Sequence, residues 1–172
     1  MSATDDIPDD GLAPLPQLSL LERVRIQAEI LVPLMHGLEA ALGRQRAYEI
    51  VGAALRDHYQ AEVRAIWDGC EHDVERFFWD WAAASDSDVA LETTYLRIDE
   101  EHVDFDVTDC QYARFWRALG EPELGFLFQC SSDYAVDEAV TPIHLRRTHT
   151  RMQGADSCDF RFSIDVPAVA EP

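Results

Sequence analysis

The 172-residue sequence contains no lysine, and its 14 basic residues, all arginine, are outnumbered by 33 acidic ones. The formal net charge of −19 disfavours binding to nucleic acid or to anionic membrane surfaces, because such binding depends on pairing phosphates with cations. The absence of lysine excludes a catalytic Schiff base. No apolar run reaches the roughly 18 residues that indicate a transmembrane helix, so we expect no membrane partner.

The sequence also lacks a secretion signal and any CxxC pair. Residues 1–17 are acidic and rich in proline, whereas a signal peptide is basic and then apolar. We therefore expect a cytoplasmic protein whose cysteines are free thiols rather than a zinc ribbon or a thioredoxin-type motif. The four cysteines are Cys70, Cys110, Cys130 and Cys158.

Hydrophobic residues make up 47% of the chain, which is enough for one folded domain. We expect residues 1–17 to be a disordered acidic tail, residues 18–166 to form the domain, and residues 167–172 to be a loose tail. In the first half, apolar residues recur at helical spacing. Ser19 and Glu22 are spaced as in a capping box at the first helix. The predicted helices span residues 19–42, 45–67 and 71–84.

From Leu91 onward the hydrophobic period changes to two, which is typical of strands. The expected elements are strands over 91–98 and 102–107, a helix over 110–119 capped by Asp109, a buried strand over 124–130, a short helix or loop over 133–140, and a hairpin over 143–165. Helices followed by strands favour an α+β fold, with N-terminal helices packed on one face of an antiparallel sheet.

The final hairpin is predicted to turn at residues 153–156, where Gly154 permits a tight connection. Alternation places Cys158 and Phe160 on one strand face and Asp159 and Arg161 on the other.

Two registers of this hairpin remain open. In one, Arg151 lies opposite Cys158 and His149 opposite Phe160, which makes a thiol–cation site. In the other, Met152, Thr150 and Thr148 face Cys158, Phe160 and Phe162, which buries fewer charges.

Cys130 and Cys158 both lie on predicted apolar strand faces, so adjacent strands would bring the two thiols together. They are either inert core residues or include a thiolate that a neighbouring cation stabilises. The candidate cations are Arg147, His149 and Arg151. Asp133, three residues after Cys130, could orient a nucleophile, hold an amidine-like group or cap a short helix.

Cys110 is predicted at a helix start, where the helix dipole lowers a thiol pKa, although Asp109 opposes this effect. A zinc site formed by Cys110, Cys130, Cys158 and His149 is conceivable, but no histidine pair has metal-binding spacing such as HExxH. We therefore expect no cofactor and no bound metal.

Several segments resemble the L-2-amino-thiazoline-4-carboxylic acid hydrolase family, over roughly residues 20–165. They are Glu22-Arg-Val-Arg-Ile-Gln-Ala-Glu-Ile-Leu-Val-Pro-Leu34, Cys110-Gln-Tyr-Ala, Leu119-Gly-Glu-Pro-Glu-Leu-Gly125, Cys130-Ser-Ser-Asp133, Arg147-Thr-His-Thr-Arg-Met-Gln-Gly154 and Cys158-Asp-Phe-Arg-Phe162.

The resemblance implies hydrolytic opening of a small cyclic amidine-like acid. Water adds to the carbon between nitrogen and sulfur of 2-aminothiazoline-4-carboxylate, the ring thiolate leaves, and N-carbamoyl-cysteine results. The family positions that carry over are Cys110, Cys130, Asp133, Thr148, Gly154, Cys158, Asp159 and Arg161, whereas His149 and Arg151 fall where the family varies.

On this resemblance we predict a covalent mechanism. The thiolate of Cys130 or Cys158 adds to the C=N carbon, and Asp133 holds the amidinium. Arg161 or Arg147 pairs with the substrate carboxylate. The remaining predicted substrate-binding residues are Cys110 and Thr148.

The chain ending is also similar to the close of vinyl-reductase-type domains, through Gly154, Cys158 and Phe160. Those domains are small α+β ligand-binding modules, some with zinc. The alternative function is therefore a non-enzymatic module that binds a small ligand or zinc, or a biosynthetic accessory protein. Aromatic residues of the second and third predicted helices could also serve a homodimer interface.

Overall fold

The computed structural model describes residues 18–71, 73–84, 87–99 and 101–165. Three helices come first: α1 (Leu20–Leu42), α2 (Arg44–Gly69) and α3 (Val74–Ala84). The shorter helical segments are α4 (Ser87–Ala90), α5 (Gln111–Ala118), α6 (Pro122–Gly125), the π-helix η1 (Phe126–Cys130), α7 (Tyr134–Ala139) and the 3₁₀-helix η2 (Arg151–Gln153). Both predicted tails, residues 1–17 and 167–172, lie outside the described residues.

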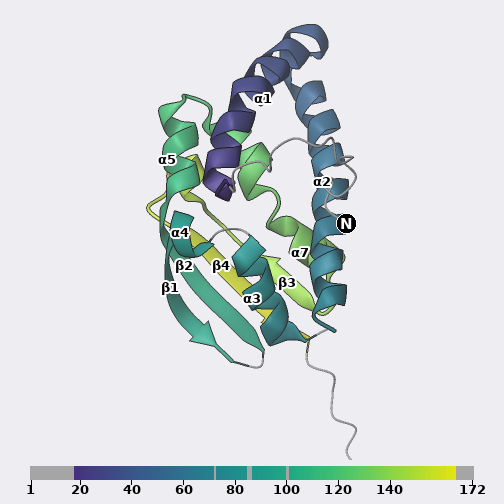
Figure 1. Ribbon diagram of the computed structural model, residues 1–172, viewed down its shortest axis with the longest axis vertical. Coiled ribbons are helices and arrows are strands. Elements are labelled where there is room, and N and C mark those ends of the chain that lie inside the picture. Colours follow the sequence, from purple (N-terminus) through teal and green to yellow (C-terminus); the bar gives the residue numbers. More distant parts are fainter. Residues whose placement is uncertain (1–17, 72, 85–86, 100, 166–172) are drawn as a thin grey trace, which may run out of the picture.

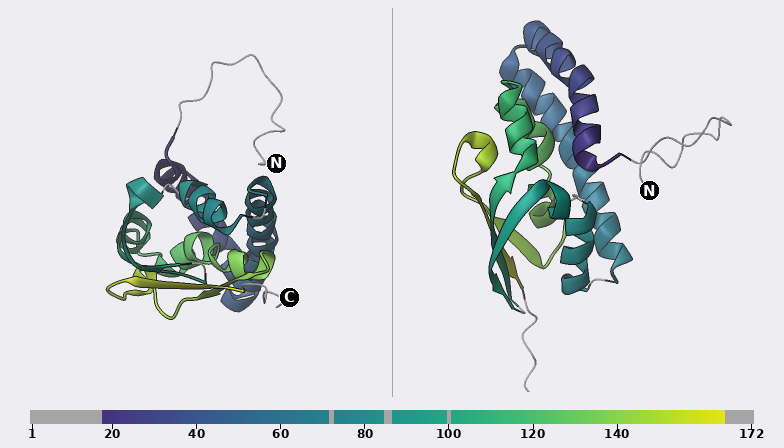
Figure 2. Two further views of the ribbon diagram at one scale, coloured as in Figure 1. Left: turned by 90° about the horizontal axis from the view of Figure 1, so that it is seen from below. Right: turned by 60° about the vertical axis from the view of Figure 1, so that its left-hand side comes forward.

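Four strands form one antiparallel sheet in the order β1-β2-β4-β3. They are β1 (Leu91–Ile98), β2 (His102–Cys110), β3 (Ile143–Arg146) and β4 (Cys158–Ile164). The helices gather on one side of this sheet (Figure 1, Figure 2). The predicted α+β fold, with helices on one face of an antiparallel sheet, is confirmed.

The first two helices form a hairpin whose ends are fixed by local interactions. At the start of α1 the Ser19 hydroxyl accepts a hydrogen bond from the Glu22 N–H at 3.2 Å, and the Glu22 carboxylate accepts one from the Ser19 N–H at 2.9 Å. The predicted capping box is therefore confirmed. Gly43 alone joins α1 to α2, with a φ of 81° that a side chain would strain.

Helix α5 begins one residue later than the sequence predicted. Cys110, not Asp109, is its N-cap residue, and the Cys110 sulfur accepts a hydrogen bond from the Ala113 N–H at 3.4 Å. Asp109 instead pairs with Arg114, at 2.7 Å between carboxylate and guanidinium.

Residues 124–130 are helical, so the buried strand predicted there is wrong. Pro122 occupies the first turn of α6, where its fixed φ favours a helix. Gly125 packs against the Trp116 side chain so closely that a Cβ atom would lie 2.5 Å from Trp116 Cγ. The Tyr59 hydroxyl of α2 then donates to the Phe128 carbonyl at 2.7 Å and holds η1 in place. Packing against two helices has overridden the period-two pattern.

The predicted final hairpin exists as β3 and β4, but both predicted registers are wrong. Ile143 pairs with Ile164, and Arg146 pairs with Arg161 as the last rung of the ladder. Beyond this rung the two strands separate, and residues 147–157 form a wide connection that contains η2 instead of a tight turn.

The carboxylate of Asp159 ends the ladder. It accepts hydrogen bonds from the backbone N–H groups of Thr148 at 2.9 Å and of His149 at 2.8 Å. The Thr150 hydroxyl then caps η2 by accepting from the Gln153 N–H at 3.2 Å. These side-chain bonds set the register, and a hydrophobic pattern cannot encode them.

The core lies between the sheet and the helices. The ring of Phe162, which is fully buried on β4, lies 5.0 Å from that of Phe78 and 5.8 Å from that of Trp81, both on α3. Among the described helices, none combines the length and the apolar character that crossing a bilayer requires.

We predict that Gly125→Ala destabilises the fold, because the added methyl group would collide with Trp116 Cβ and Cγ, which stand near the backbone of α5. Overpacking of this kind costs about 1–3 kcal/mol in unfolding free energy. Urea denaturation followed by circular dichroism measures the change.

Gly37→Ala is the matched control. Gly37 is exposed inside α1, and a Cβ there meets nothing within 4 Å. This variant should gain about 0.5–1 kcal/mol from the better helix propensity of alanine. Equal stability of the two variants would contradict the close packing of α6 on α5.

Candidate functional site

A cavity of about 880 Å³ lies between α3 and the helix-facing side of β1, β2 and β4. Its wall is mostly apolar, and aromatic rings supply much of it: Phe78, Trp79, Trp81, Tyr95, Phe105, Tyr112 and Phe160. The volume falls in the upper part of the range of about 300–1,000 Å³ that is typical of sites for small organic ligands.

The polar part of the wall gathers five residues that the sequence analysis had selected. They are Cys110, Cys130, Asp133, Arg147 and Cys158. They come from the end of β2, from η1, from the turn into α7, from the segment after β3 and from the start of β4. Residues up to 48 positions apart in sequence therefore border one hollow.

An ion pair between Asp133 and Arg147 is the centre of this polar wall. One terminal nitrogen of Arg147 bonds Asp133 Oδ2, and the other donates to the Cys130 carbonyl at 2.7 Å. The guanidinium carbon lies 4.6 Å from the ring centre of Tyr134 and 5.0 Å from that of Phe160. The Arg147 side chain is 1% exposed, whereas that of Asp133 is 21% exposed. Arg147 is thus buried behind Asp133, and the carboxylate is the group that a ligand can reach.

A helical turn positions Cys130 and Asp133. The Ser131 N–H donates to the Phe126 carbonyl at 2.9 Å. This donor and acceptor are separated along the chain as in a π-helix, one residue further apart than in an α-helix. The Ser131 hydroxyl donates to the Leu127 carbonyl and the Ser132 hydroxyl to the Gln129 carbonyl, both at 2.6 Å. π-Helical segments are frequent at functional sites. Here Gln129, Cys130, Ser132 and Asp133 line the cavity from this segment and from the turn that follows it.

Burial raises the pKa of Asp133 above the ordinary value of 3.8, although the charge of Arg147 opposes the rise. Oδ2 is engaged by Arg147, and no described residue hydrogen-bonds Oδ1. A carboxyl group of this kind can exchange a proton with a ligand or hold a hydrogen-bond donor.

The three thiols of the wall are protonated at neutral pH. Burial raises the pKa of Cys110 to about 11, despite the hydrogen bond from Ala113. Burial also raises the pKa of Cys158, which accepts a hydrogen bond from the Arg151 N–H at 3.2 Å. For Cys130, the partly exposed member, burial and then the charge of Asp133 raise the pKa well above 9.0. The thiolate that the covalent mechanism requires is therefore not favoured in this environment.

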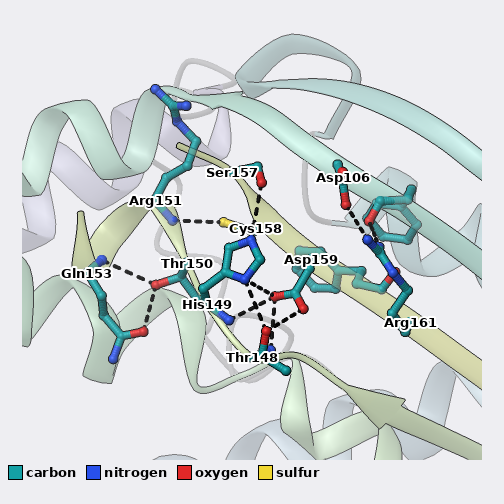
Figure 3. A network of polar contacts seen from close by, with 12 residues as sticks. Asp106, Thr148, His149, Thr150, Arg151, Gln153, Ser157, Cys158, Asp159 and Arg161 are labelled. Carbon is teal, nitrogen blue, oxygen red and sulfur yellow. Dashed lines mark hydrogen bonds and ion pairs between the residues drawn. The ribbon is translucent and has the colours of Figure 1, made fainter. Parts of the chain in front are cut away.

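Two of the predicted substrate-binding residues are not among those that line the cavity. Thr148 donates from its hydroxyl to Asp159 Oδ2 at 2.7 Å (Figure 3). Arg161 bonds Asp106 at 2.7 Å and the Phe105 carbonyl at 2.8 Å, and the figure shows both networks along one side of β4. Their roles here are to fix the β3–β4 connection and to bridge β2 and β4.

The conceivable zinc set is not assembled. His149 contacts Asp159 at 3.2 Å and Ser157 at 3.2 Å, and it is not among the residues that line the cavity with the three cysteines. Among the residues that the structure places, no three His, Cys, Asp or Glu side chains are grouped to hold a metal ion.

Sequence reasoning missed the aromatic part of the site. Phe78 and Trp81 are three residues apart on α3 and face the sheet, where Phe105 and Phe160 stack with ring centres 4.8 Å apart. Helical spacing identified the first two as core residues, but only the sheet register shows that these rings surround an open volume.

The fold and the site define a class of protein: an α+β domain with a ligand-sized cavity between its helices and one face of its sheet. The family model described as L-2-amino-thiazoline-4-carboxylic acid hydrolase matches residues 23–162. The chain therefore belongs to the L-2-amino-thiazoline-4-carboxylic acid hydrolase family, which confirms the resemblance seen in the sequence.

The other two comparisons do not assign the chain to a family. No curated protein matches the chain. Among solved structures, it is similar to the phenol-responsive sensory domain of the transcription activator PoxR, crystallised with phenol. The TM-score is 0.48 at 14% identity, and the likeness covers 78% of this chain and 72% of that one.

We predict that Cys110, Cys130 and Cys158 react slowly with iodoacetamide at pH 7.5, because raised pKa values leave little thiolate. Their rates should still be rising with pH at pH 9.0, because the pKa of each thiol is raised above that ordinary value. Mass spectrometry of digests taken along a time course measures each rate separately.

The same protein labelled in denaturant provides the control rates. A cysteine of the native chain that reacts faster at pH 7.5 than in denaturant would reveal a stabilised thiolate and would restore the covalent mechanism.

Proposed function

We propose that the chain is a hydrolase that opens a cyclic amidine in the cavity, with Asp133 as the acid–base group. Family membership supports a hydrolase. The observation that carries the assignment to Asp133 is its placement: a carboxylate with a raised pKa borders an apolar cavity and is held from behind by the buried Arg147.

In the proposed reaction a water oxygen bonds to the ring carbon between nitrogen and sulfur, and the carbon–sulfur bond breaks. One water proton ends on the ring nitrogen and the other on the leaving sulfur. Asp133 takes a proton from the water during attack and returns one as the ring opens, so that it acts as base and then as acid. A pKa nearer to neutrality suits a group that must do both.

Arg147 acts in this proposal as a positioning residue. Both of its terminal nitrogens are already bonded within the chain, and its side chain is 1% exposed. A substrate carboxylate would therefore find no free pair of terminal nitrogens, and the Nε atom, which has no hydrogen-bond partner among the described residues, is buried. Arg147 instead fixes one carboxylate oxygen of Asp133 and leaves the other for the substrate or the water.

The three thiols have a different role in this proposal from the covalent one predicted earlier. A neutral thiol is a poor nucleophile, and each of the three has a raised pKa. They serve as polarisable, weakly polar wall atoms beside the reacting ring.

A ligand-binding module without catalysis is the second candidate, and the cavity itself favours it. An apolar hollow of about 880 Å³ ringed by aromatic side chains suits tight binding of an apolar ligand whether or not a reaction follows. Turnover separates the two candidates, because a pure binding module releases its ligand unchanged.

We predict that Asp133→Asn lowers kcat for opening of 2-aminothiazolines by about 10²–10⁴-fold, the usual contribution of an acid–base group. For the unmodified chain, kcat/KM should rise with pH through a pKa above 3.8 and then level off, because the attacking water needs the ionised carboxylate. Liquid chromatography with mass detection of the ring-opened carbamoyl thiol measures both.

Asp137→Asn is the matched control, since it removes a carboxylate four residues further on. Asp137 pairs with His144 and does not line the cavity. It should keep the activity and the pH profile of the parent chain. Unchanged kcat in Asp133→Asn, or no turnover of any 2-aminothiazoline by the parent chain, would overturn the proposed function.

We predict that Cys130→Ser and Cys158→Ser each retain kcat within about threefold, because neither sulfur forms a bond to the substrate in the proposed reaction. Steady-state kinetics of the two single variants and the double variant are the measurement. A loss of about 100-fold or more in one of them, together with a substrate adduct on that cysteine in the parent chain, would establish covalent catalysis instead.

A further inference from the structure

The charges that line the cavity are unequal. Among the described lining residues, Arg147 is the one cation, while Asp73, Glu75, Asp99 and Asp133 are acidic. Arg147 is neutralised by Asp133. Asp99 is paired with Arg97, and Asp73 and Glu75 are exposed at the start of α3. Within the described part of the wall, no cation is left without a carboxylate partner to receive an anionic ligand.

The acidic residues lie at both ends of the cavity. Asp73 and Glu75 at the start of α3 and Asp99 beside the β1–β2 turn lie toward one end of the sheet (Figure 1). Asp133 borders the hollow near the opposite end of β2, where Cys110 precedes α5. A positive or hydrogen-donating ligand group is thus favoured at both ends, by the exposed Asp73 and Glu75 at one and by Asp133 Oδ1, which no described residue hydrogen-bonds, at the other.

The aromatic wall favours the same ligand charge. The faces of aromatic rings attract cations, and the attraction is stronger where water is excluded. Phe160 already makes such a contact with Arg147, at 5.0 Å. Phe78, Trp81 and Phe105 provide further ring surface to the cavity.

The size of the cavity gives the second property of the ligand. About 880 Å³ is a volume that suits a drug-sized molecule, and a single small ring would leave most of the apolar wall unoccupied. Burial of the apolar part of a ligand contributes about 25 cal/mol per Å² of surface removed from water. A ligand with a bulky apolar body would therefore bind more tightly than the ring alone.

We infer that the substrate is a neutral or cationic amidine that carries an aromatic or other bulky apolar body, and not a small anionic ring acid. The amidine N–H groups would bond Asp133, and the body would lie between α3 and the rings of β2 and β4. This inference rests on the proposed function and specifies the substrate class of the same site.

A matched pair of ligands tests the inference in the full chain. Biphenyl-4-carboxamidine and biphenyl-4-carboxylate have the same shape and opposite charge, and isothermal titration calorimetry gives the affinity of each. We expect the amidine to bind at least about tenfold more tightly than the carboxylate, because one desolvated ion pair contributes about 1.4 kcal/mol or more.

The variant Asp133→Asn should reverse this preference. It removes the partner of Arg147, so that the guanidinium becomes the uncompensated charge beside the cavity. The carboxylate should then bind more tightly than the amidine, whereas Asp137→Asn should keep the parent preference. Circular dichroism confirms that each variant is folded.

A variant with a smaller cavity tests the role of the ligand's apolar body separately, and it leaves the ion pair between Asp133 and Arg147 unchanged. Thr93 lines the cavity from β1, and Thr93→Phe reduces its volume. This change should lower the affinity for biphenyl-4-carboxamidine by at least about tenfold and leave the affinity for 2-amino-2-thiazoline within about threefold of the parent value. If Asp133→Asn fails to fold, this variant still tests the inference.

Equal or tighter binding of the carboxylate by the parent chain, or binding of neither biphenyl, would overturn the inference. Turnover of 2-aminothiazoline-4-carboxylate could persist in that case, and the proposed hydrolase function would stand. Conversely, a clear amidine preference without turnover of any 2-aminothiazoline would support the ligand class and reject the reaction.

Discussion

Burial of the Arg147 guanidinium is the constraint on which the site depends. A charge with 1% of its side chain exposed is tolerated when it is paired and hydrogen-bonded, and here Asp133, the Cys130 carbonyl and two aromatic rings surround the guanidinium, while its Nε atom has no partner among the described residues. These partners come from three different segments: η1 with the turn into α7, the start of α7 itself, and β4. The interaction therefore connects the helical layer to the sheet at the polar wall of the cavity. It also determines that Asp133, and not Arg147, is the group exposed to the cavity.

One consequence is a division of roles between carboxyl and sulfur. The same low-polarity surroundings raise the pKa of Asp133 and of the three thiols, but from different starting values. A carboxyl group that starts near 3.8 moves toward neutrality, where proton exchange is easy. A thiol that starts near 9.0 moves away from neutrality and loses reactivity. The same burial thus moves the carboxyl pKa toward neutrality and the thiol pKa values away from it, so a cluster of sulfur atoms does not by itself indicate covalent chemistry.

The sequence predicted the layers and much of the site, and it failed where side-chain bonds override periodicity. Helical spacing located α1, α2 and α3, and alternation located β1, β2 and the inward face of β4. It could not show that Gly125 must pack on Trp116, which makes residues 124–130 helical. Nor could it show that Asp159 binds the backbone of Thr148 and His149, which sets the register of β3 and β4. Of the predicted site residues, Cys110, Cys130, Asp133, Arg147 and Cys158 border the cavity, whereas Thr148 and Arg161 form hydrogen bonds within the sheet and its connection.

The family and the cavity constrain function in different ways, and the two constraints are compatible. Membership of the family concerns the reacting group, and Asp133 is the carboxylate that borders the cavity beside the buried Arg147 and the three cysteines. The rest of a ligand contacts surfaces that the reaction does not use, such as the rings of α3 and β2. Binding energy from these remote contacts can orient the reacting ring against Asp133, since interactions far from the chemistry contribute to holding the reacting atoms in place. In the proposed function, a wide aromatic cavity therefore supplies the orientation that a weakly bound small ring would lack, since no cation among the described wall residues is free to anchor that ring.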